Sequence, residues 1–134
     1  MMKVGITGGM GSGKSTAAKI FEALKIPVFY ADHESKQILE TNQLVKEKLT
    51  NHFGSRLFPN DKLDRSFLAS QIFNNQEAMS FVNSVMHPAV AERFIEWSEK
   101  QTAPYCLKEA AILFETGSYK ELYKTILVVA DKEI

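Results

Sequence analysis

A glycine-rich segment near the N-terminus constrains the fold of this chain more than any other feature of its sequence. The segment, residues 4–16, reads VGITGGMGSGKST. It fits the pattern G-x-x-x-x-G-K-S/T at four fixed positions, which are Gly8, Gly13, Lys14 and Ser15. The apolar residues 3–7 predict a buried strand before the loop, and the apolar spacing in residues 14–24 predicts a helix after it. A strand, a glycine loop and a helix in this order are typical of an α/β fold with a parallel sheet.

The loop is suited to binding the phosphate groups of a nucleotide. Glycine permits backbone conformations that other residues avoid, so successive N–H groups can point toward one centre and form an anion site. The N-terminus of the following helix adds its dipole at the same point. We expect Lys14 to reach the β- and γ-phosphates and the Ser15 hydroxyl to hold Mg²⁺ between them. A glycine turn that only joins a strand to a helix is the competing interpretation.

Composition limits the other classes of partner. Sixteen Lys and Arg residues balance sixteen Asp and Glu residues, so no net field draws the chain to nucleic acid or to an anionic membrane, and a small molecule is the expected partner. Cys106 is the only cysteine, which excludes an intrachain disulfide and indicates a reducing compartment. The chain has no apolar run of membrane-spanning length and no signal-type segment, so we expect a cytoplasmic protein.

The spacing of apolar residues places the remaining elements. Three further apolar runs predict parallel strands buried on both faces, at residues 26–31, 103–113 and 125–130. Helices are expected at residues 42–53, after Asp64 as an N-cap, at 76–86 and from Pro88 onward, with Gly54 ending the first of them. We interpret these helices as a lobe inserted at about residues 33–101 into a single domain spanning 1–134.

Asp32 is the candidate catalytic carboxylate. It follows the second predicted strand, and the carboxyl ends of parallel strands converge on the ligand crevice of such folds. A carboxylate there can accept a proton from an attacking hydroxyl, directly or through a metal-bound water. An N-cap role on a helix over residues 33–39 is the competing interpretation, and the two roles are compatible. The chain lacks an Asn-Lys-x-Asp element and an Asp-x-x-Gly switch, which disfavours a GTPase, and its third strand ends in AILFETG without a standard Walker B aspartate.

Several motifs together resemble the dephospho-CoA kinase family over essentially the whole chain. The opening GITGGMGSGKST matches the start of that family, and VFYADHESKQIL is similar to its second-strand motif. The segments LDRSFLASQIF and FVNSVMHPAV resemble motifs of its helical lobe, and ILFETG resembles the end of its third strand. The Asn-x-x-x-His-Pro element is the most distinctive of these after the loop.

The resemblance implies a three-layer P-loop kinase fold with a parallel sheet and a helical substrate-binding insertion. It implies transfer of the γ-phosphate of ATP to the ribose 3′-hydroxyl of dephospho-CoA, with Mg²⁺, to give CoA and ADP. Asp32 and Lys14 would be catalytic. The ATP-binding residues would be Gly8, Gly9, Gly11, Ser12, Gly13, Lys14, Ser15 and Thr16. The acceptor-binding residues would be Thr7, Asp32, Arg65, His87 and Glu115.

The residues themselves support the acceptor set only in part. His87, directly before Pro88, is expected at a helix junction, where its side chain points out of the core or caps a helix. Arg65 in the first turn of a helix is unfavourably placed for the helix dipole, so an anionic partner or an exposed surface position is expected. Glu115 at the end of a strand either reaches the site or caps a turn.

The chain departs from the family pattern in composition and in length. Tyr30 stands where the family often has the first aspartate of Asp-Ala-Asp, and residues 111–113 read Ala-Ile-Leu in place of Pro-Leu-Leu. Family members are longer, so we expect this chain to be C-terminally truncated, without the arginine-bearing lid, and to leave the edge of its fourth strand unpaired. Two other functions remain open: another small-molecule kinase acting on a nucleoside, nucleotide or sugar acid, and a non-catalytic nucleotide-binding module.

Overall fold

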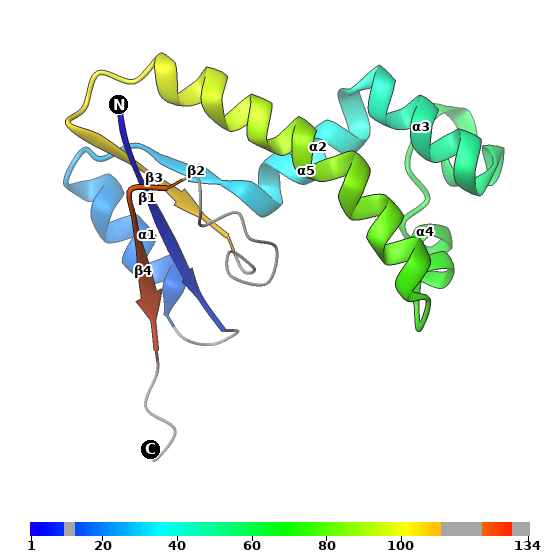
Figure 1. Ribbon diagram of the computed structural model, residues 1–134, viewed down its shortest axis with the longest axis horizontal. Coiled ribbons are helices and arrows are strands. Elements are labelled where there is room, and N and C mark those ends of the chain that lie inside the picture. Colours follow the sequence, from blue (N-terminus) through cyan, green and yellow to red (C-terminus); the bar gives the residue numbers. More distant parts are fainter. Residues whose placement is uncertain (10–12, 111–121, 130–134) are drawn as a thin grey trace. The chain divides into compact units, whose positions relative to one another are not determined.

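The computed structural model describes residues 1–9, 13–110 and 122–129, and these form two compact units (Figure 1). The first unit comprises Met1–Asp32 and Phe94–Ile134, and the second comprises His33–Arg93. The second unit is therefore continuous in sequence, whereas the first is assembled from the two ends of the chain.

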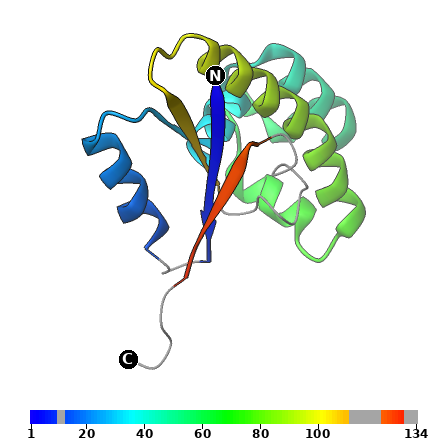
Figure 2. The same cartoon turned by 60° about the vertical axis from the view of Figure 1, so that its left-hand side comes forward.

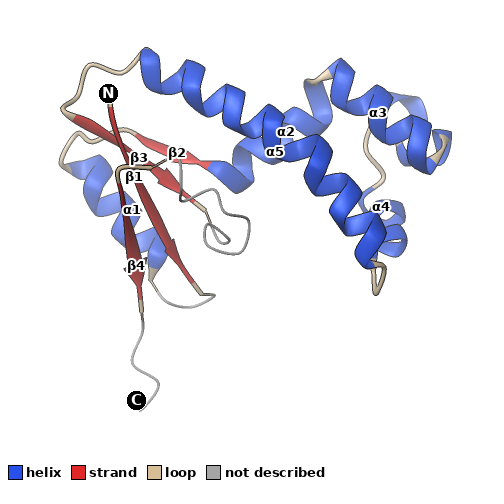
Figure 3. Cartoon of the chain, in the orientation of Figure 1, coloured by secondary structure: helices blue, strands red, loops and turns tan. Residues whose placement is uncertain are grey.

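A four-stranded parallel sheet forms the centre of the first unit (Figure 3). Its strands are β1 (Met2–Gly8), β2 (Val28–Tyr30), β3 (Tyr105–Glu109) and β4 (Lys124–Val128). They lie in the order β2-β3-β1-β4, so that β1 and β3 occupy the middle of the sheet. The register pairs Glu109 with both Ile6 and Tyr30, which brings the carboxyl ends of three strands to one edge. The predicted parallel sheet is confirmed.

One face of the sheet packs against helix α1 (Lys14–Ala23), which lies beside the strands in Figure 2. Val4, Ile26 and Leu107 form a buried cluster here, and Phe21 of α1 packs against it. Leu107 has no exposed surface, because it lies on a central strand beneath the helix. Burial of such side chains, at about 1.5–3 kcal/mol each, holds α1 against the sheet.

The opposite face packs against the last turns of helix α5 (Gln76–Glu99). The Phe29 ring of β2 lies 5.1 Å from the Phe94 ring and 5.5 Å from the Trp97 ring, measured between centroids. The Lys3 and Lys108 ammonium groups approach the same Phe94 ring, at 5.9 and 5.1 Å. Helix, sheet and helix make three layers within the first unit, as predicted.

The expectation that all strands are buried on both faces is wrong for β4. Ile126 is 37% exposed and Leu127 is 58% exposed. The sheet order explains this difference, because β4 lies at an edge and, within the described residues, pairs with β1 alone. Hydrophobic side chains were sufficient to identify the strand but not to place it within the sheet. The predicted unpaired edge of this strand is confirmed for the described part of the chain.

The second unit is built of helices, and capping residues set two of the helix starts and one of the helix ends. The helices are α2 (Ala31–Thr41), α3 (Gln43–Phe53), α4 (Arg65–Ile72) and most of α5, with two 3₁₀ turns at Ser55–Leu57 and Pro59–Asp61. The Asn42 side chain accepts a hydrogen bond from the Val45 N–H, and the Asp64 side chain accepts one from the Phe67 N–H. Gly54, with φ of 94°, follows α3. The predicted N-cap at Asp64 and terminator at Gly54 are confirmed.

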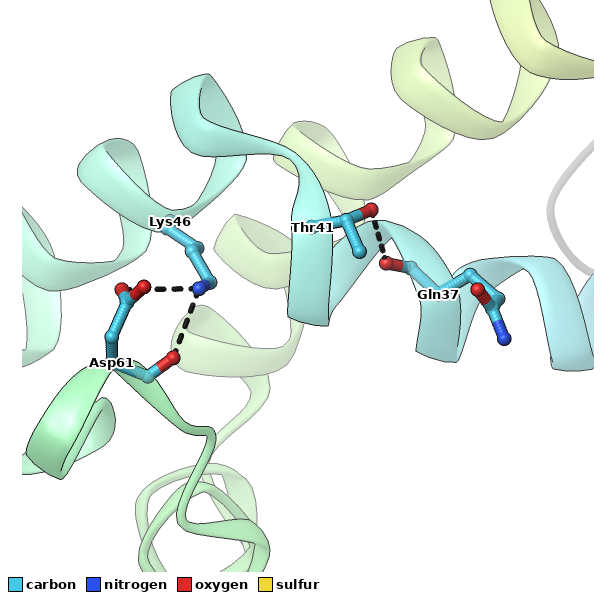
Figure 4. A network of polar contacts seen from close by, with 4 residues as sticks. All are labelled: Gln37, Thr41, Lys46 and Asp61. Atoms are coloured by element: carbon cyan, nitrogen blue, oxygen red, sulfur yellow. Dashed lines mark hydrogen bonds and ion pairs between the residues drawn. The ribbon is translucent and has the colours of Figure 1, made fainter.

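A nearly buried lysine fixes the segment between α3 and α4 (Figure 4). The Lys46 side chain is 7% exposed, and its Nζ donates to the main-chain carbonyl and to Oδ1 of Asp61, at 3.0 and 3.1 Å. The same ammonium lies 5.4 Å from the centroid of the Phe58 ring. Because a buried cation is costly without partners, these contacts hold the 3₁₀ turns against α3. Thr41 Oγ1, also drawn in Figure 4, donates to the Gln37 carbonyl at 2.7 Å.

Residues 76–99 form one continuous helix, so the prediction of two helices separated before Pro88 is wrong. Proline lacks the N–H that would bond to the carbonyl four residues earlier, and its ring crowds that carbonyl. The buried positions Met86 and Val90 lie on either side of Pro88 at the spacing of one helical face. Burial of this face outweighs the local cost of the proline, and His87 therefore lies inside a helix and not at a junction.

Replacement of Pro88 with alanine should stabilise the chain. Alanine restores the missing hydrogen bond and relieves the contact with the preceding turn, which outweighs the greater flexibility of the unfolded chain, for a net gain of about 1 kcal/mol or more. Urea unfolding followed by circular dichroism measures this change. Pro59→Ala is the matched control, because Pro59 begins a 3₁₀ turn, where proline is favoured, and should bring no gain. A Pro88→Ala variant no more stable than wild type would contradict the expectation.

Candidate functional site

The N-terminus of α1 is arranged as an anion site. Gly13 precedes the helix with φ of 91°, in the left-handed region that a residue with a side chain rarely adopts. The Gly13 carbonyl accepts a hydrogen bond from the Ala17 N–H at 2.9 Å, the first hydrogen bond of the helix. Gly13 has no side chain that could cap the first N–H groups of α1. Those groups and the helix dipole are directed toward the carboxyl edge of the sheet. Gly11 and Ser12, also predicted to bind phosphate, lie outside the described residues.

Lys14, the lysine of the loop pattern, forms an ion pair with Glu109 at the end of β3. Lys14 Nζ lies 3.1 Å from Glu109 Oε1, and the two side chains are only 15% and 8% exposed. Sequence reasoning did not select Glu109 as a site residue. A signal was present, because Glu109 is a charged residue inside an apolar run predicted to be a buried strand.

The other predicted phosphate-binding residues of the described chain surround this helix start. Gly8 ends β1 and is buried, whereas Gly9 is exposed. Ser15 and Thr16 lie in the first turn of α1, and both are exposed. An exposed hydroxyl beside the lysine of the loop pattern is the kind of oxygen ligand that Mg²⁺ accepts together with phosphate oxygens.

Tyr30 is held as a neutral phenol at the same edge. Its hydroxyl donates to a carboxylate oxygen of Glu22 on α1. Burial, the hydrogen bond to Glu22 and the negative charges of Glu22 and Glu109 raise the pKa of Tyr30 to about 12. Tyr30 pairs in register with Glu109 on the neighbouring strand. The Tyr30 hydroxyl therefore stays protonated, on a residue whose register partner on β3 is a glutamate.

Asp32 lies in the first turn of α2 and is exposed. Because α2 begins at Ala31, one residue after the end of β2, Asp32 is inside the helix and does not cap a helix that begins at residue 33. Its carboxylate is near the positive end of the α2 dipole. Thr7, also predicted on the acceptor side, is buried within β1 and pairs in register with Leu127.

Two predicted acceptor residues belong to the second unit. Arg65 is the first residue of α4, and its Nη2 lies 3.1 Å from Glu40 Oε1, with both side chains about half exposed. Arg65 therefore has a carboxylate of the chain as its ion-pair partner at an exposed surface position. His87 is exposed within α5. Glu115, the remaining acceptor residue, lies outside the described residues.

Residues 1–9, 13–110 and 122–129 contain no group of three or more His, Cys, Asp or Glu side chains that could hold a metal ion. Within the same ranges no helix combines the length and hydrophobicity needed to cross a membrane.

Comparison with known proteins gives a consistent result. The dephospho-CoA kinase family model matches residues 2–134. A dephospho-CoA kinase of Bacteroides fragilis is 36% identical over 134 residues, covering 99% of this chain and 65% of the relative. One from Legionella pneumophila is 38% identical over 131 residues, covering 97% of this chain and 65% of the relative.

Two solved structures share the fold. A crystal structure from Thermus thermophilus superposes with a TM-score of 0.84 at 32% identity, covering 97% of this chain and 66% of that one. A dephospho-CoA kinase from Campylobacter jejuni superposes with a TM-score of 0.71 at 29% identity, covering 93% and 64% respectively. The predicted fold class is confirmed, and the chain spans about 65% of the length of the relatives that it matches.

Proposed function

The chain belongs to the dephospho-CoA kinase family, and from this premise we propose that the protein transfers the γ-phosphate of ATP to the ribose 3′-hydroxyl of dephospho-CoA, giving CoA and ADP. The observation that carries this proposal is the start of α1, where left-handed Gly13 is followed by Lys14 at the carboxyl edge of a parallel sheet. This is the arrangement that binds nucleotide phosphates.

The proposed ATP-binding residues are those of the loop and the first turn of α1. The proposed backbone contacts to the phosphates come from Gly8, Gly9, Gly11, Ser12 and Gly13, and Lys14 is proposed to approach the β- and γ-phosphates. Ser15 holds Mg²⁺, which neutralises the phosphate oxygens when bound. Thr16 completes the first turn beside them.

Asp32 is the proposed group that acts on the acceptor. It follows β2 at the edge to which Lys14 and Glu109 also belong, and it is open to solvent. A carboxylate in this place accepts the proton of the attacking hydroxyl or orients that hydroxyl toward the γ-phosphate. Thr7, Arg65, His87 and Glu115 are the other proposed acceptor residues, and the second unit is the proposed acceptor lobe.

The arginines of the second unit favour a hydroxyl acceptor over an acceptor phosphate. A kinase that phosphorylates a phosphate group needs arginines available for that anion. Arg65 is paired with Glu40, and Arg93 Nε lies 2.5 Å from a carboxylate oxygen of Glu34. The Arg56 guanidinium lies 5.0 Å from the centroid of the Phe67 ring. Arg56 and Arg93 thus have neighbours within the unit, and the half-exposed, weak pair with Glu40 leaves Arg65 as the one of the three that is proposed to reach the acceptor, which agrees with an uncharged ribose hydroxyl as the reacting group.

A phosphate-transfer assay tests the proposal. The chain and the Bacteroides fragilis relative are incubated with Mg-ATP and, separately, dephospho-CoA, AMP, a nucleoside and gluconate, and the products are identified by mass. Phosphorylation of dephospho-CoA alone is the expected result. Transfer to another acceptor would contradict dephospho-CoA as the substrate but would still agree with a kinase.

Binding measurements separate catalysis from nucleotide binding. The chain should bind Mg-ATP, and Lys14→Ala should weaken that binding by about tenfold or more, because a charge-assisted contact to phosphate contributes about 1.5–3 kcal/mol. Binding of Mg-ATP without transfer to any acceptor would favour a nucleotide-binding module.

A further inference from the structure

The junction between β2 and α2 sets the place of Asp32, and the sheet alone holds this junction weakly. Strand β2 has three residues, and within the described residues it lies at an edge and pairs with β3 alone. Helix α2 begins at Ala31, directly after the strand, and Asp32 is its second residue. Because no loop separates strand from helix, any shift of the end of β2 moves the Asp32 carboxylate with it.

Two neighbouring side chains hold β2 from opposite faces of the sheet, because successive residues of a strand point to opposite sides. Phe29 is 2% exposed, and its ring packs against the rings of Phe94 and Trp97 on α5. On the other face, the hydroxyl of Tyr30 donates to a carboxylate oxygen of Glu22 on α1. The last residue of β2 is thus bonded to the helix that follows the phosphate loop.

The bond between Tyr30 and Glu22 joins a neutral donor to a charged acceptor. Such hydrogen bonds are roughly twice as strong as those between two neutral groups. Burial and the contact with Glu22 raise the pKa of Tyr30 to about 12, so the phenol keeps its proton at neutral pH. The bond is therefore a lasting connection between α1 and the end of β2. Phenylalanine at position 30 would remove it while filling the same space.

We infer that Tyr30 is a positioning residue for Asp32: by bonding to Glu22 it holds the junction of β2 and α2 against α1. This inference rests on the proposed function, because it requires that Asp32 act on the acceptor. Helix α1 begins at the phosphate loop, so the bond fixes the carboxylate relative to the proposed phosphate site. Tyr30 acts through Asp32 and not by contact with a substrate. Small displacements of a reacting group are costly, up to about 10²-fold in rate for about 1 Å.

Kinetics of Tyr30→Phe test the inference. The kcat for phosphate transfer to dephospho-CoA should fall about tenfold, whereas the dissociation constant of Mg-ATP should stay within about twofold of the wild-type value. In an Asp32→Asn background the same change should lower kcat by less than about twofold, because the residue it positions is already lost. Tyr105→Phe is the matched control, because Tyr105 is a half-buried tyrosine of β3, and it should keep the wild-type kcat.

Variants of the acceptor give an independent measurement. Glu22→Ala removes the acceptor and should lower kcat as much as Tyr30→Phe, and the double variant should be no slower than either. Glu22→Gln keeps a side-chain oxygen that accepts from the phenol, so it should recover most of the rate lost in Glu22→Ala. Backbone N–H groups of β2 and α2 should exchange with deuterium faster in Tyr30→Phe than in wild type, a readout that needs no substrate.

The possible outcomes are distinct. Wild type that transfers phosphate to no acceptor overturns the proposed function, and the inference with it. If wild type phosphorylates dephospho-CoA, the inference alone is overturned by a wild-type kcat in Tyr30→Phe, by a further tenfold loss in the Asp32→Asn background, or by an equal loss in Tyr105→Phe. Where Tyr30→Phe does not fold, Glu22→Ala decides, because Glu22 is exposed on α1, and a wild-type kcat in that variant contradicts the inference.

Discussion

Replacement of Asp32 with asparagine will lower kcat for phosphate transfer to dephospho-CoA by about 10²–10⁴-fold, the range expected for loss of a general base. The dissociation constant of Mg-ATP should change little, because the proposed phosphate site is at the start of α1 and Asp32 lies on α2. Steady-state kinetics and calorimetry on the same preparations measure the two quantities.

The size of the loss distinguishes two roles of the carboxylate. If Asp32 only orients the hydroxyl, asparagine keeps part of that function and the loss falls at the lower end, since phosphoryl transfer demands little base catalysis. Glu99→Gln is the control, because Glu99 is an exposed carboxylate at the end of α5, and its loss should leave kcat unchanged. An Asp32→Asn variant with the wild-type rate would exclude Asp32 from the reaction.

Replacement of Leu107 with alanine will lower the free energy of unfolding by about 2–5 kcal/mol, as for other fully buried leucines. Leu107 has no exposed surface and packs with Val4 and Ile26 between the sheet and α1. The cavity left by alanine cannot close, because β3 is paired on both sides. Urea denaturation of the chain measures the change.

Leu127 provides the comparison for this experiment. It is a leucine on edge strand β4 with 58% of its surface exposed, so Leu127→Ala should cost less than about 1 kcal/mol. Equal losses for the two variants would mean that the cluster under α1 is not the core of the first unit.

The elements that local sequence determines were predictable. The glycine loop predicted β1 and α1, because its backbone N–H groups and left-handed glycine require a strand before it and a helix after it. The cap at Asp64 was predictable for the same reason, since the side chain bonds to a backbone group three residues away.

Features that depend on distant residues were not predictable in the same way. The exposure of β4 follows from the order of strands in the sheet, and the continuity of α5 follows from what its apolar face packs against. The pairing of Lys14 with Glu109 joins the first helix to a strand near the other end of the chain. Each of these depends on tertiary contacts that override or extend a local preference.

The order of strands also determines when the sheet of the first unit can begin to form during synthesis. Neither β1 nor β2 has a sheet partner in the first part of the chain, because both pair with β3. Met2, for example, can pair only after Tyr105 has been synthesised. The continuous segment His33–Arg93 leaves the ribosome before any strand pair can form. Such distant pairing slows folding and leaves two apolar strands exposed on the nascent chain. The sheet against which α1 packs can therefore form only when the last third of this chain has emerged.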